Sequence, residues 1–464
     1  MLLSPDIRHP TQVRRGVLAF ACSLSLITYL DRVCISRAQH EMQRDLGFSD
    51  AALGLVFSAF TLGYAIFEVP AGYFGDTWGP RSILTRIVIA WSVFTALTGC
   101  VWPFSLPIGP LVFDSLALML LLRFLFGAGE AGAYPLLTRV VADWFPTRER
   151  GSALGAIWMW ARVGGAFAPL ALGRLSVLVG GWRQAFWVLG GVGVLWAVAF
   201  RLWFVDRPEN HPGVNDAERR LISEGKAASS PGQAWPGWGV ILGSPSVLLL
   251  CFSSFWLCFG WFFYPTWQPR YLKDVFGFEA DGWRLELISG APFLAGAAGC
   301  LFGGKLTDVL IRGPLGPRWG RAVIALGGFV GAGACVLATG FVTEAWQAVA
   351  LLCLAFLVND LAVPVMWASA GDIGGPCAGS LSGLMNTVGW GLGSFGPFLT
   401  GWYADHGPHG SAIENKSQFI SGSSLAYAGG AVVLILAATL WVKRDAARAA
   451  GKPLADSTGP AVGR

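Results

Sequence analysis

The stretch Gly72-Tyr73-Phe74-Gly75-Asp76-Thr77-Trp78-Gly79-Pro80-Arg81 follows a long apolar segment, and Gly304-Lys305-Leu306-Thr307-Asp308 with Gly320-Arg321 follows another one. Glycine lets two helix ends approach closely, aspartate can cap a neighbouring helix or pair with an arginine, and cations favour the inner side of a membrane. We interpret the two stretches as one structural latch, used twice, at the cytoplasmic ends of helices. Its members are Gly72, Asp76, Gly79, Arg81, Asp308 and Arg321.

A second repeat has a common offset. Gly151-Ser152-Ala153-Leu154-Gly155 recurs as Gly379-Ser380-Leu381-Ser382-Gly383, about 228 residues later, and Pro169 and Gly173 recur as Pro397 and Gly401 at the same offset. The offset is about half of the chain. The pattern therefore predicts one structural unit that is present twice.

Composition indicates a membrane protein. The chain has 464 residues, of which 54% are hydrophobic and 13% are charged, with a mean hydropathy of +0.55, whereas about a quarter of residues are charged in soluble proteins. A helix needs about 20 apolar residues to cross a bilayer. We predict an all-α fold with about twelve spans in two pseudo-symmetric six-helix bundles. The spans are roughly 15–37, 51–74, 82–102, 115–140, 152–178, 184–204, 246–269, 285–307, 322–343, 347–370, 378–402 and 421–442.

The predicted division is a tail (1–14), a first bundle (15–205), a linker (206–245), a second bundle (246–443) and a second tail (444–464). In the linker, Asn215 and Glu218 are spaced as a helix N-cap and its capping-box partner. Arginines and lysines are concentrated in the tails, the linker and alternate loops, which predicts that both termini are cytoplasmic in a plasma membrane, here the bacterial inner membrane. Because these cations are spread over short loops, the sequence does not favour nucleic-acid binding.

Metal and enzyme chemistry are not expected. The nine cysteines lie mostly within predicted spans without metal-ligand spacing, and the five histidines lie in tails or loops. A histidine proton relay or a histidine metal site inside the membrane is therefore excluded. No nucleophile–base pair stands out in the spans, so we predict a protein that is not an enzyme and that needs no cofactor.

Ionisable side chains occur inside the predicted spans. Each costs roughly 2.5–3.5 kcal/mol at the centre of a spanning helix, so such residues usually face a protein interior or a watery path. Their mixed sign indicates a route for a charged solute. The seven residues are Asp31, Arg32, Glu68, Arg123, Glu130, Arg162 and Asp360.

Arg123 and Glu130 are seven residues apart, which places them on almost the same helix face about 10 Å apart. Gly127 lies between them on that face and is expected to leave room. A guanidinium and a carboxylate at two depths can bind an anion at one level and exchange a proton at the other. The alternative is a set of internal salt bridges in which Arg32 and Arg123 neutralise Asp31 and Glu130, and the two roles are compatible.

The pattern Gly-x-x-x-Asp-x-x-Gly-x-Arg at 72–81, echoed after the eighth predicted span, resembles the signature loop of the major facilitator superfamily. This resemblance implies two six-helix bundles that rock about a site near the membrane midplane. Within the superfamily, Tyr-x-Asp-Arg at 29–32 and Arg-x6-Glu-Ala-x-x-x-Pro at 123–135 resemble the anion:cation symporter family, which includes bacterial galactonate and hexuronate transporters and sialin. The stretches 181–186, 207–212 and 383–386 reinforce this resemblance.

The resemblance implies proton-coupled uptake of a small organic anion, often a sugar acid such as a hexonate, hexuronate or aldarate. The family's proton-handling acids correspond to Asp31 and Glu130, and its anion-binding arginines correspond to Arg32 and Arg123. Its polar cage corresponds to Tyr29, Tyr64 and Asn386. The physical argument agrees, because burial favours the neutral form of a carboxylic acid whereas a neighbouring arginine favours the charged form.

Four residues lie outside this pattern. Glu68 stands where a neutral amide is expected and can be an additional acid. Arg162 either grips a second carboxylate of a dianionic substrate or pairs with an acid of the bundle. Asp360 either lines the cavity or caps a kink next to Pro364. The aromatic residues of span 246–269 are more typical of packing than of a sugar-binding platform, and Tyr264 is the one that we expect to contact the ligand.

Other functions remain open at this point. An exchanger of organic phosphates also uses paired arginines, although exchange of anions needs no acid in the membrane. Sodium coupling could use Asp360 or Glu68. A transporter-like membrane sensor is a further alternative, but the short tails and linker contain no obvious signalling domain. We expect a monomer whose partners are the anion, protons and the lipid bilayer.

Overall fold

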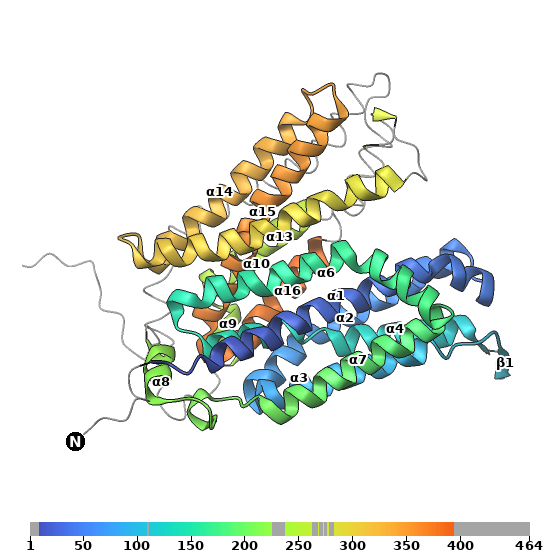
Figure 1. Cartoon of the computed structure of the whole chain (residues 1–464), viewed down its shortest axis with the longest axis horizontal. Helices are drawn as coiled ribbons and strands as arrows, with labels where there is room; N and C mark the ends of the chain where they lie inside the picture. Colours follow the sequence, from blue (N-terminus) through green and yellow to red (C-terminus); the bar gives the residue numbers. More distant parts are fainter. Residues whose placement is uncertain are drawn as a thin grey trace, which may run out of the picture.

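The computed structural model describes residues 9–108, 111–224, 237–261 and 283–393, together with 268, 272, 276 and 277. Figure 1 shows these residues as long helices and short connections. The first half of the chain forms α1 (Val13–Leu46), α2 (Asp50–Trp78), α3 (Pro80–Thr98), α4 (Ser115–Glu130), α5 (Ala133–Trp144), α6 (Arg150–Val179) and α7 (Trp182–Trp203). The linker region contains α8 (Asp216–Ser223) and α9 (Trp238–Leu242). The second half forms α10 (Pro245–Trp261), α13 (Trp283–Arg312), α14 (Gly316–Ala338), α15 (Ala345–Gly374) and α16 (Ala378–Gly393).

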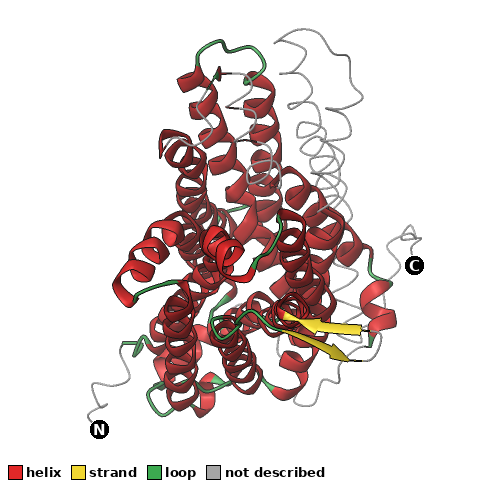
Figure 2. Cartoon of the chain, turned by 90° about the vertical axis from the view of Figure 1, so that its right-hand side faces the viewer, coloured by secondary structure: helices red, strands yellow, loops and turns green. Residues whose placement is uncertain are grey.

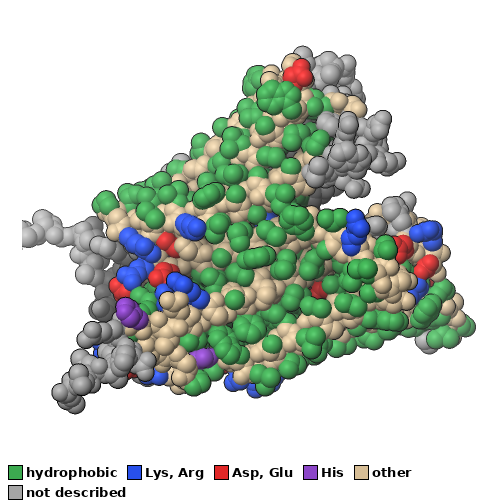
Figure 3. All heavy atoms as spheres, viewed as in Figure 1, with side chains coloured by type: hydrophobic (Ala, Val, Ile, Leu, Met, Phe, Trp, Pro, Cys, Tyr) green, Lys and Arg blue, Asp and Glu red, His purple; other side chains and the backbone are tan. Residues whose placement is uncertain are grey.

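The helices are apolar enough for a bilayer. Within the described ranges, eight helices can cross a membrane by length and composition, or nine when the bent pair Thr147–Ala168 and Leu170–Val179 is counted as one span. Figure 3 shows hydrophobic side chains over the middle of the molecule and charged side chains near its two ends. The predicted all-α membrane class is therefore confirmed. A helix is present at each of the first eleven predicted spans, whereas span 421–442 and the tail 444–464 lie outside the described residues.

Three local features differ from the predicted spans. The first helix continues to Leu46, well beyond the predicted end at 37. The predicted span 115–140 is divided into α4 and α5 by a turn at Ala131 and Gly132, just after Glu130. The connection before α4 contains a short antiparallel pair, β1 (Ser105–Ile108) and β2 (Leu111–Asp114), which Figure 2 shows beside the helices.

Two pairs of helices form the most extensive contacts between the two halves of the chain. α2 packs along α16, and α6 packs along α13. Glycines make both contacts close, because a Cβ atom added to Gly72 would lie 2.3 Å from the carbonyl oxygen of Gly379. A Cβ atom added to Gly304 would lie equally close, at 2.3 Å, to the carbonyl oxygen of Gly151. In Figure 1 the halves lie together at the end that carries α8 and diverge toward the β1 end.

Aspartates hold both contacts in the same way. The carboxylate of Asp76 accepts hydrogen bonds from the backbone N–H groups of Gly379 and Ser380, at the start of α16, at 2.9 and 2.6 Å. The carboxylate of Asp308 accepts from the N–H groups of Gly151 and Ser152, at the start of α6, at 3.0 and 2.7 Å. Each acid therefore caps a helix of the other half, where unpaired N–H groups and the helix dipole favour negative charge.

The arginines of the predicted latch have other partners. Arg81 donates through its guanidinium to the carbonyl oxygen of Arg201 at 2.7 Å and fastens α3 to the end of α7. Arg321 forms an ion pair with Asp372 at 2.5 Å. Gly79 has a φ of 86°, a conformation that favours glycine, between α2 and α3.

The linker is anchored to the first half of the chain. Asn215 caps α8 as expected, with its side chain accepting from the N–H of Glu218 at 2.9 Å. The carboxylate of Glu218 does not complete a capping box. It instead accepts from the hydroxyl of Thr11 at 2.6 Å and from the N–H groups of Val13 and Arg14 at 3.0 and 3.1 Å, and thus caps α1.

Candidate functional site

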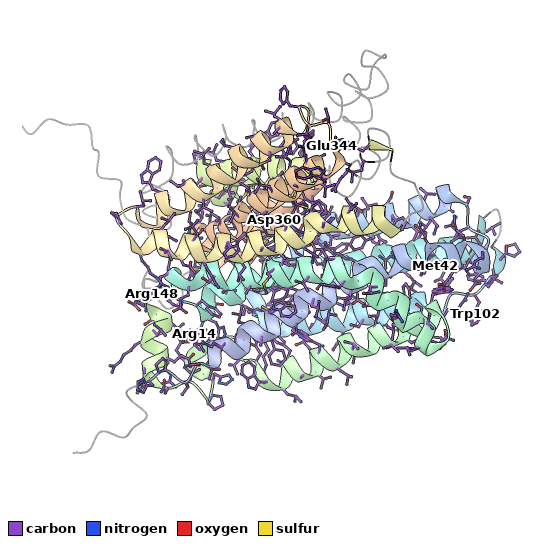
Figure 4. All side chains as sticks on the ribbon, turned by 45° about the horizontal axis from the view of Figure 1, so that its top comes forward. Arg14, Met42, Trp102, Arg148, Glu344 and Asp360 are labelled. Atoms are coloured by element: carbon purple, nitrogen blue, oxygen red, sulfur yellow. The ribbon has the colours of Figure 1, made fainter. Side chains whose placement is uncertain are left out.

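Asp360, one of the charged residues of the spans, lies at middle depth between the two ends of the molecule. Figure 4 shows Asp360 within the helices, whereas Arg14 and Arg148 lie at the end with α8 and Met42 and Trp102 at the opposite end. α1, α2, α4 and α6 contribute the side chains of the first half, and α15 and α16 contribute those of the second half. The site is therefore at the contact between the halves.

An ion pair between α1 and α4 is the first component. Nε of Arg32 donates to Oε1 of Glu130 at 2.6 Å, and the exposed fractions of these side chains are 12% and 1%. The pair leaves hydrogen-bonding capacity unused. Within the described part of the chain, NH2 of Arg32 and Oε2 of Glu130 are buried without a hydrogen-bond partner. An anion that approached Arg32 would thus find a free donor.

Aromatic rings surround the Arg32 guanidinium. Its Cζ atom lies 4.6 Å from the ring centre of Tyr64 and 5.7 Å from those of Tyr29 and Trp390. Arg32, Tyr64 and Trp390 line a small pocket together with Phe60, Thr61, Ala65 and Gly391. Because α2 contributes Tyr64 and α16 contributes Trp390, the pocket has walls from both halves of the chain.

A second cation and a second acid lie close to this pair. Arg123 and Asp31 are each only 1% exposed. Nε and NH1 of Arg123 and both carboxylate oxygens of Asp31 have no hydrogen-bond partner among the described residues. Cζ of Arg123 lies 4.3 Å from the ring centre of Phe126, and the charges of Asp31 and Glu130 act on it. Two buried charges of opposite sign are therefore near each other but not joined in an ion pair.

The expected room at Gly127 is absent. A Cβ atom at Gly127 would lie 2.2 Å from the carbonyl oxygen of Phe60 on α2. In the same contact, a Cβ atom at Gly63 would lie 2.1 Å from the carbonyl oxygen of Phe124 on α4. The expectation of free space is wrong, because the two glycines bring the helix backbones together instead. This close packing fixes the position of the helix face that carries Arg123 and Glu130.

Glu68 forms a contact between the halves. Its carboxylate is fully buried and accepts from the amide nitrogen of Asn386 and, at 3.4 Å, from the hydroxyl of Thr387. Asn386 also lies 3.4 Å from the hydroxyl oxygen of Tyr64, to which its amide donates. Glu68 is not among the residues that line the pocket, so its role as an additional acid of the cavity stays a prediction.

Arg162 and Asp360 are joined to each other. Nε of Arg162 donates to Oδ2 of Asp360 at 2.6 Å, and NH2 donates to Oδ1 at 3.3 Å. NH1 of Arg162 donates to the hydroxyl oxygen of Tyr29 at 3.2 Å. The expected pairing of Arg162 with an acid thus occurs, but the acid belongs to the other half of the chain. The carboxylate of Asp360 accepts hydrogen bonds from Arg162 rather than capping a kink at Pro364.

The sequence pattern does not single out Phe60, Trp261 or Trp390. The signal that could have found two of them is helical spacing, because Phe60 precedes Tyr64 by four residues and Trp390 follows Asn386 by four. Tyr264, the aromatic residue expected to contact the ligand, lies outside the described residues.

Comparison with known proteins agrees with the fold and the sequence motifs. A family model described as Major Facilitator Superfamily matches residues 21–397. A protein of Cupriavidus necator described as a probable sulfoacetate transporter is 34% identical over 401 residues, which cover 85% of this chain and 88% of the relative. A probable galactarate/D-glucarate transporter of Bacillus subtilis is 31% identical over 392 residues, which cover 82% of this chain and 83% of the relative. The hexuronate transporter of the same organism is 28% identical over 441 residues, which cover 94% of this chain and 96% of the relative.

Solved structures show the same fold. The transporter FucP in its outward conformation has a TM-score of 0.67 at 13% identity, with 92% of this chain and 99% of that chain covered. A bacterial homologue of the lysosomal transporter Spinster, in an inward-facing conformation, has a TM-score of 0.56 at 20% identity, with 92% of this chain and 96% of that chain covered. The chain therefore belongs to the major facilitator superfamily, and it is an integral membrane transporter rather than an enzyme.

Proposed function

We propose that the protein is a proton-coupled symporter of a small organic anion, such as a sugar acid, and that it works by alternating access. The observation that carries this proposal is the ion pair of Arg32 with the buried Glu130, in which Arg32 lines the pocket and retains an unpaired donor. Relatives described as transporters of sulfoacetate, galactarate or D-glucarate and hexuronate support an anionic substrate.

The pair supplies a coupling step. A substrate carboxylate can take over the planar donor fork of Arg32, which suits bidentate binding. Glu130 would then be a buried carboxylate without its cation, a state that is costly in apolar surroundings and that protonation relieves. Binding of the anion and uptake of a proton therefore favour each other, which is the requirement for symport.

Asp31 and Arg123 provide a second stage for the proton and the anion. Asp31 on α1 and Arg123 on α4 are both buried, and neither side chain has a hydrogen-bond partner within the described ranges. A proton that leaves Glu130 has Asp31 as a nearby acceptor, and an anion that leaves Arg32 has Arg123 as a nearby cation. We assign the roles of proton carriers to Asp31 and Glu130 on this basis.

The direction of transport follows from the proposed orientation. With the linker end in the cytoplasm of a bacterial cell, the Asp76 and Asp308 caps close the inner side and the diverging ends face outward. In this state an external anion and an external proton can enter together. The rocking that follows would release both caps, and we propose that one chain suffices for this cycle.

Exchange of organic phosphates and coupling to sodium are the competing functions. Exchange needs no proton carrier, which leaves no role for Asp31, a buried acid whose carboxylate has no hydrogen-bond partner among the described residues. We therefore test purified protein in proteoliposomes for uptake of glucarate and sulfoacetate, with an inward proton gradient, an inward sodium gradient or internal phosphate. The proposal predicts accumulation that requires the proton gradient. Accumulation driven only by sodium or by internal phosphate would contradict it.

A further inference from the structure

The pair of Arg162 and Asp360 repeats the arrangement of Arg32 and Glu130 at a second place. Arg162, Asp360 and Glu130 are buried and the side chain of Arg32 is 12% exposed, and in each pair the Nε atom of the arginine lies 2.6 Å from a carboxylate oxygen. The two pairs differ in one respect. Arg32 and Glu130 both belong to the first half of the chain, whereas Arg162 on α6 reaches across to Asp360 on α15.

Tyr29 connects the two guanidinium groups. Its ring centre lies 5.7 Å from Cζ of Arg32, and its hydroxyl oxygen accepts a hydrogen bond from NH1 of Arg162 at 3.2 Å. The two cations are therefore separated by little more than one phenol ring and its contacts. This separation is comparable to the length of a small molecule that carries an anionic group at each end.

A line of aromatic rings leads from one cation to the other. The ring of Trp390, which faces Arg32, lies 5.3 Å from the ring of Trp261 between centres. Trp261 in turn lies 5.6 Å from Cζ of Arg162. An apolar wall between two cationic ends suits a short carbon chain, because the wall covers the chain while the arginines bind its ends.

We propose that Arg162 forms a second anion subsite and that the preferred substrates are dianions, with one anionic group at Arg32 and the other at Arg162. This inference rests on the proposed function and specifies its substrate class. The second anionic group would replace Asp360 on Arg162 as the first replaces Glu130 on Arg32. An arginine that already holds a carboxylate in two hydrogen bonds has the geometry to hold another one.

Occupation of this subsite also affects the contact between the halves. Asp360 receives hydrogen bonds from Arg162, from Asn359 at 3.1 Å and from the thiol of Cys300 at 3.6 Å. When a substrate takes Arg162, Asp360 keeps its two neighbours in the second half but loses its partner in the first half. A dianion would thus loosen one bridge between α6 and α15, whereas a monoanion on Arg32 would leave it intact.

The test compares anions of matched size by isothermal titration calorimetry on the full chain in detergent. Glucarate is paired with gluconate, and sulfoacetate with ethanesulfonate, so that each pair differs by one anionic group. The wild type is expected to bind the dianion about tenfold more tightly or better in at least one pair. The double variant Arg162→Gln/Asp360→Asn removes both charges together and avoids leaving one buried charge unpaired.

In the double variant we expect the preference for the dianion to fall by about tenfold to a hundredfold, while the affinity for the monoanion changes by less than about threefold. Arg162→Lys keeps the charge but loses the planar guanidinium, so it should reduce the preference for the dianion by a smaller factor. It is the test variant if the double variant does not fold. Arg174→Gln, at an exposed position of the same helix, is the control and should change neither affinity.

Two results would overturn the subsite. One is a wild type that binds both members of each pair equally, and the other is an equal loss for monoanion and dianion in the Arg162 variants, which indicates a structural bridge alone. Failure of the wild type to bind any of the four anions is a different result, because it would contradict the proposed function itself.

Discussion

At the scale of single residues, the candidate site is explained by the cost of burying charge. The membrane setting made Arg32, Arg123 and Glu130 predictable from sequence, since an ionisable residue in a span needs a reason to be there. Sequence could not predict which acid each arginine would hold. Arg32 pairs with Glu130, while Arg123 has no ion pair within the described residues, because these partners depend on how the helices of the bundle are arranged around each side chain.

Arg32→Lys should weaken binding of the substrate anion about tenfold to a hundredfold, which is the range for losing a hydrogen bond to a charged group. Lysine keeps the positive charge but lacks the planar guanidinium, which donates two parallel hydrogen bonds and whose Cζ atom lies 4.6 Å from the ring centre of Tyr64. Calorimetry with the transported anion measures the effect. Arg174→Lys on the exposed side of α6 is the matched control, and equal affinities in all three proteins would exclude Arg32 from the binding site.

At the scale of elements, helix ends determine which helices of the two halves meet. The repeated glycines and aspartates predict a latch from sequence alone, and the structure specifies its form, with Asp76 capping α16 and Asp308 capping α6. The turn that divides α4 from α5 was not predictable, because glycines and apolar residues around Ala131 also fit a continuous helix. The β1–β2 pair was likewise not predictable from so short an apolar stretch.

Asp76→Asn should open the contact between α2 and α16. An amide retains one acceptor oxygen but loses the charge that faces the N-terminus of α16, so the closed state is weakened by about 1 kcal/mol or more. Cys377 is 2% exposed and precedes α16, so it reports the opening. We expect maleimide labelling of Cys377, followed by peptide mass spectrometry, to be several times faster in the variant.

Asp114→Asn is the control for this experiment, because Asp114 also caps a helix by accepting from the N–H of Ala117 at 2.9 Å but lies at the start of α4. Labelling of Cys377 should be unchanged in this control. An equal increase of the labelling rate in both variants would indicate general destabilisation. No increase of the rate in Asp76→Asn would show that Asp76 does not hold α2 against α16.

The linker helix gives a second prediction at this scale. Glu218→Gln should lower the midpoint of thermal unfolding by about 2–4 °C. The reason is that the charged carboxylate of Glu218 accepts hydrogen bonds from Thr11, Val13 and Arg14 at the start of α1. Differential scanning fluorimetry in detergent measures the shift. Glu209→Gln, at an exposed position of the linker, is the matched control and should leave the midpoint within about 1 °C. A Glu218 variant as stable as this control would show that α8 is not anchored.

At the scale of the whole molecule, the two halves are joined by buried polar contacts, one of which is an ion pair whose partners come from different halves. The common offset of about 228 residues made a repeated unit predictable, and the apolar spans made the membrane class predictable. The contacts between halves were not predictable in detail. Residues far apart in sequence form them, as in the pairs of Glu68 with Asn386 and Arg162 with Asp360, and no local pattern specifies such partners.

The central claim, that displacement of Glu130 from Arg32 couples the anion to a proton, is tested most directly by proton flux. Proteoliposomes with the full chain are mixed with the transported anion, and the external pH is recorded. The wild type should make the medium alkaline, whereas Glu130→Gln should lose at least about nine-tenths of this signal and still exchange labelled for unlabelled anion across the membrane. An alkaline shift in Glu130→Gln as large as in the wild type, or anion uptake by the wild type without any shift, would contradict the account.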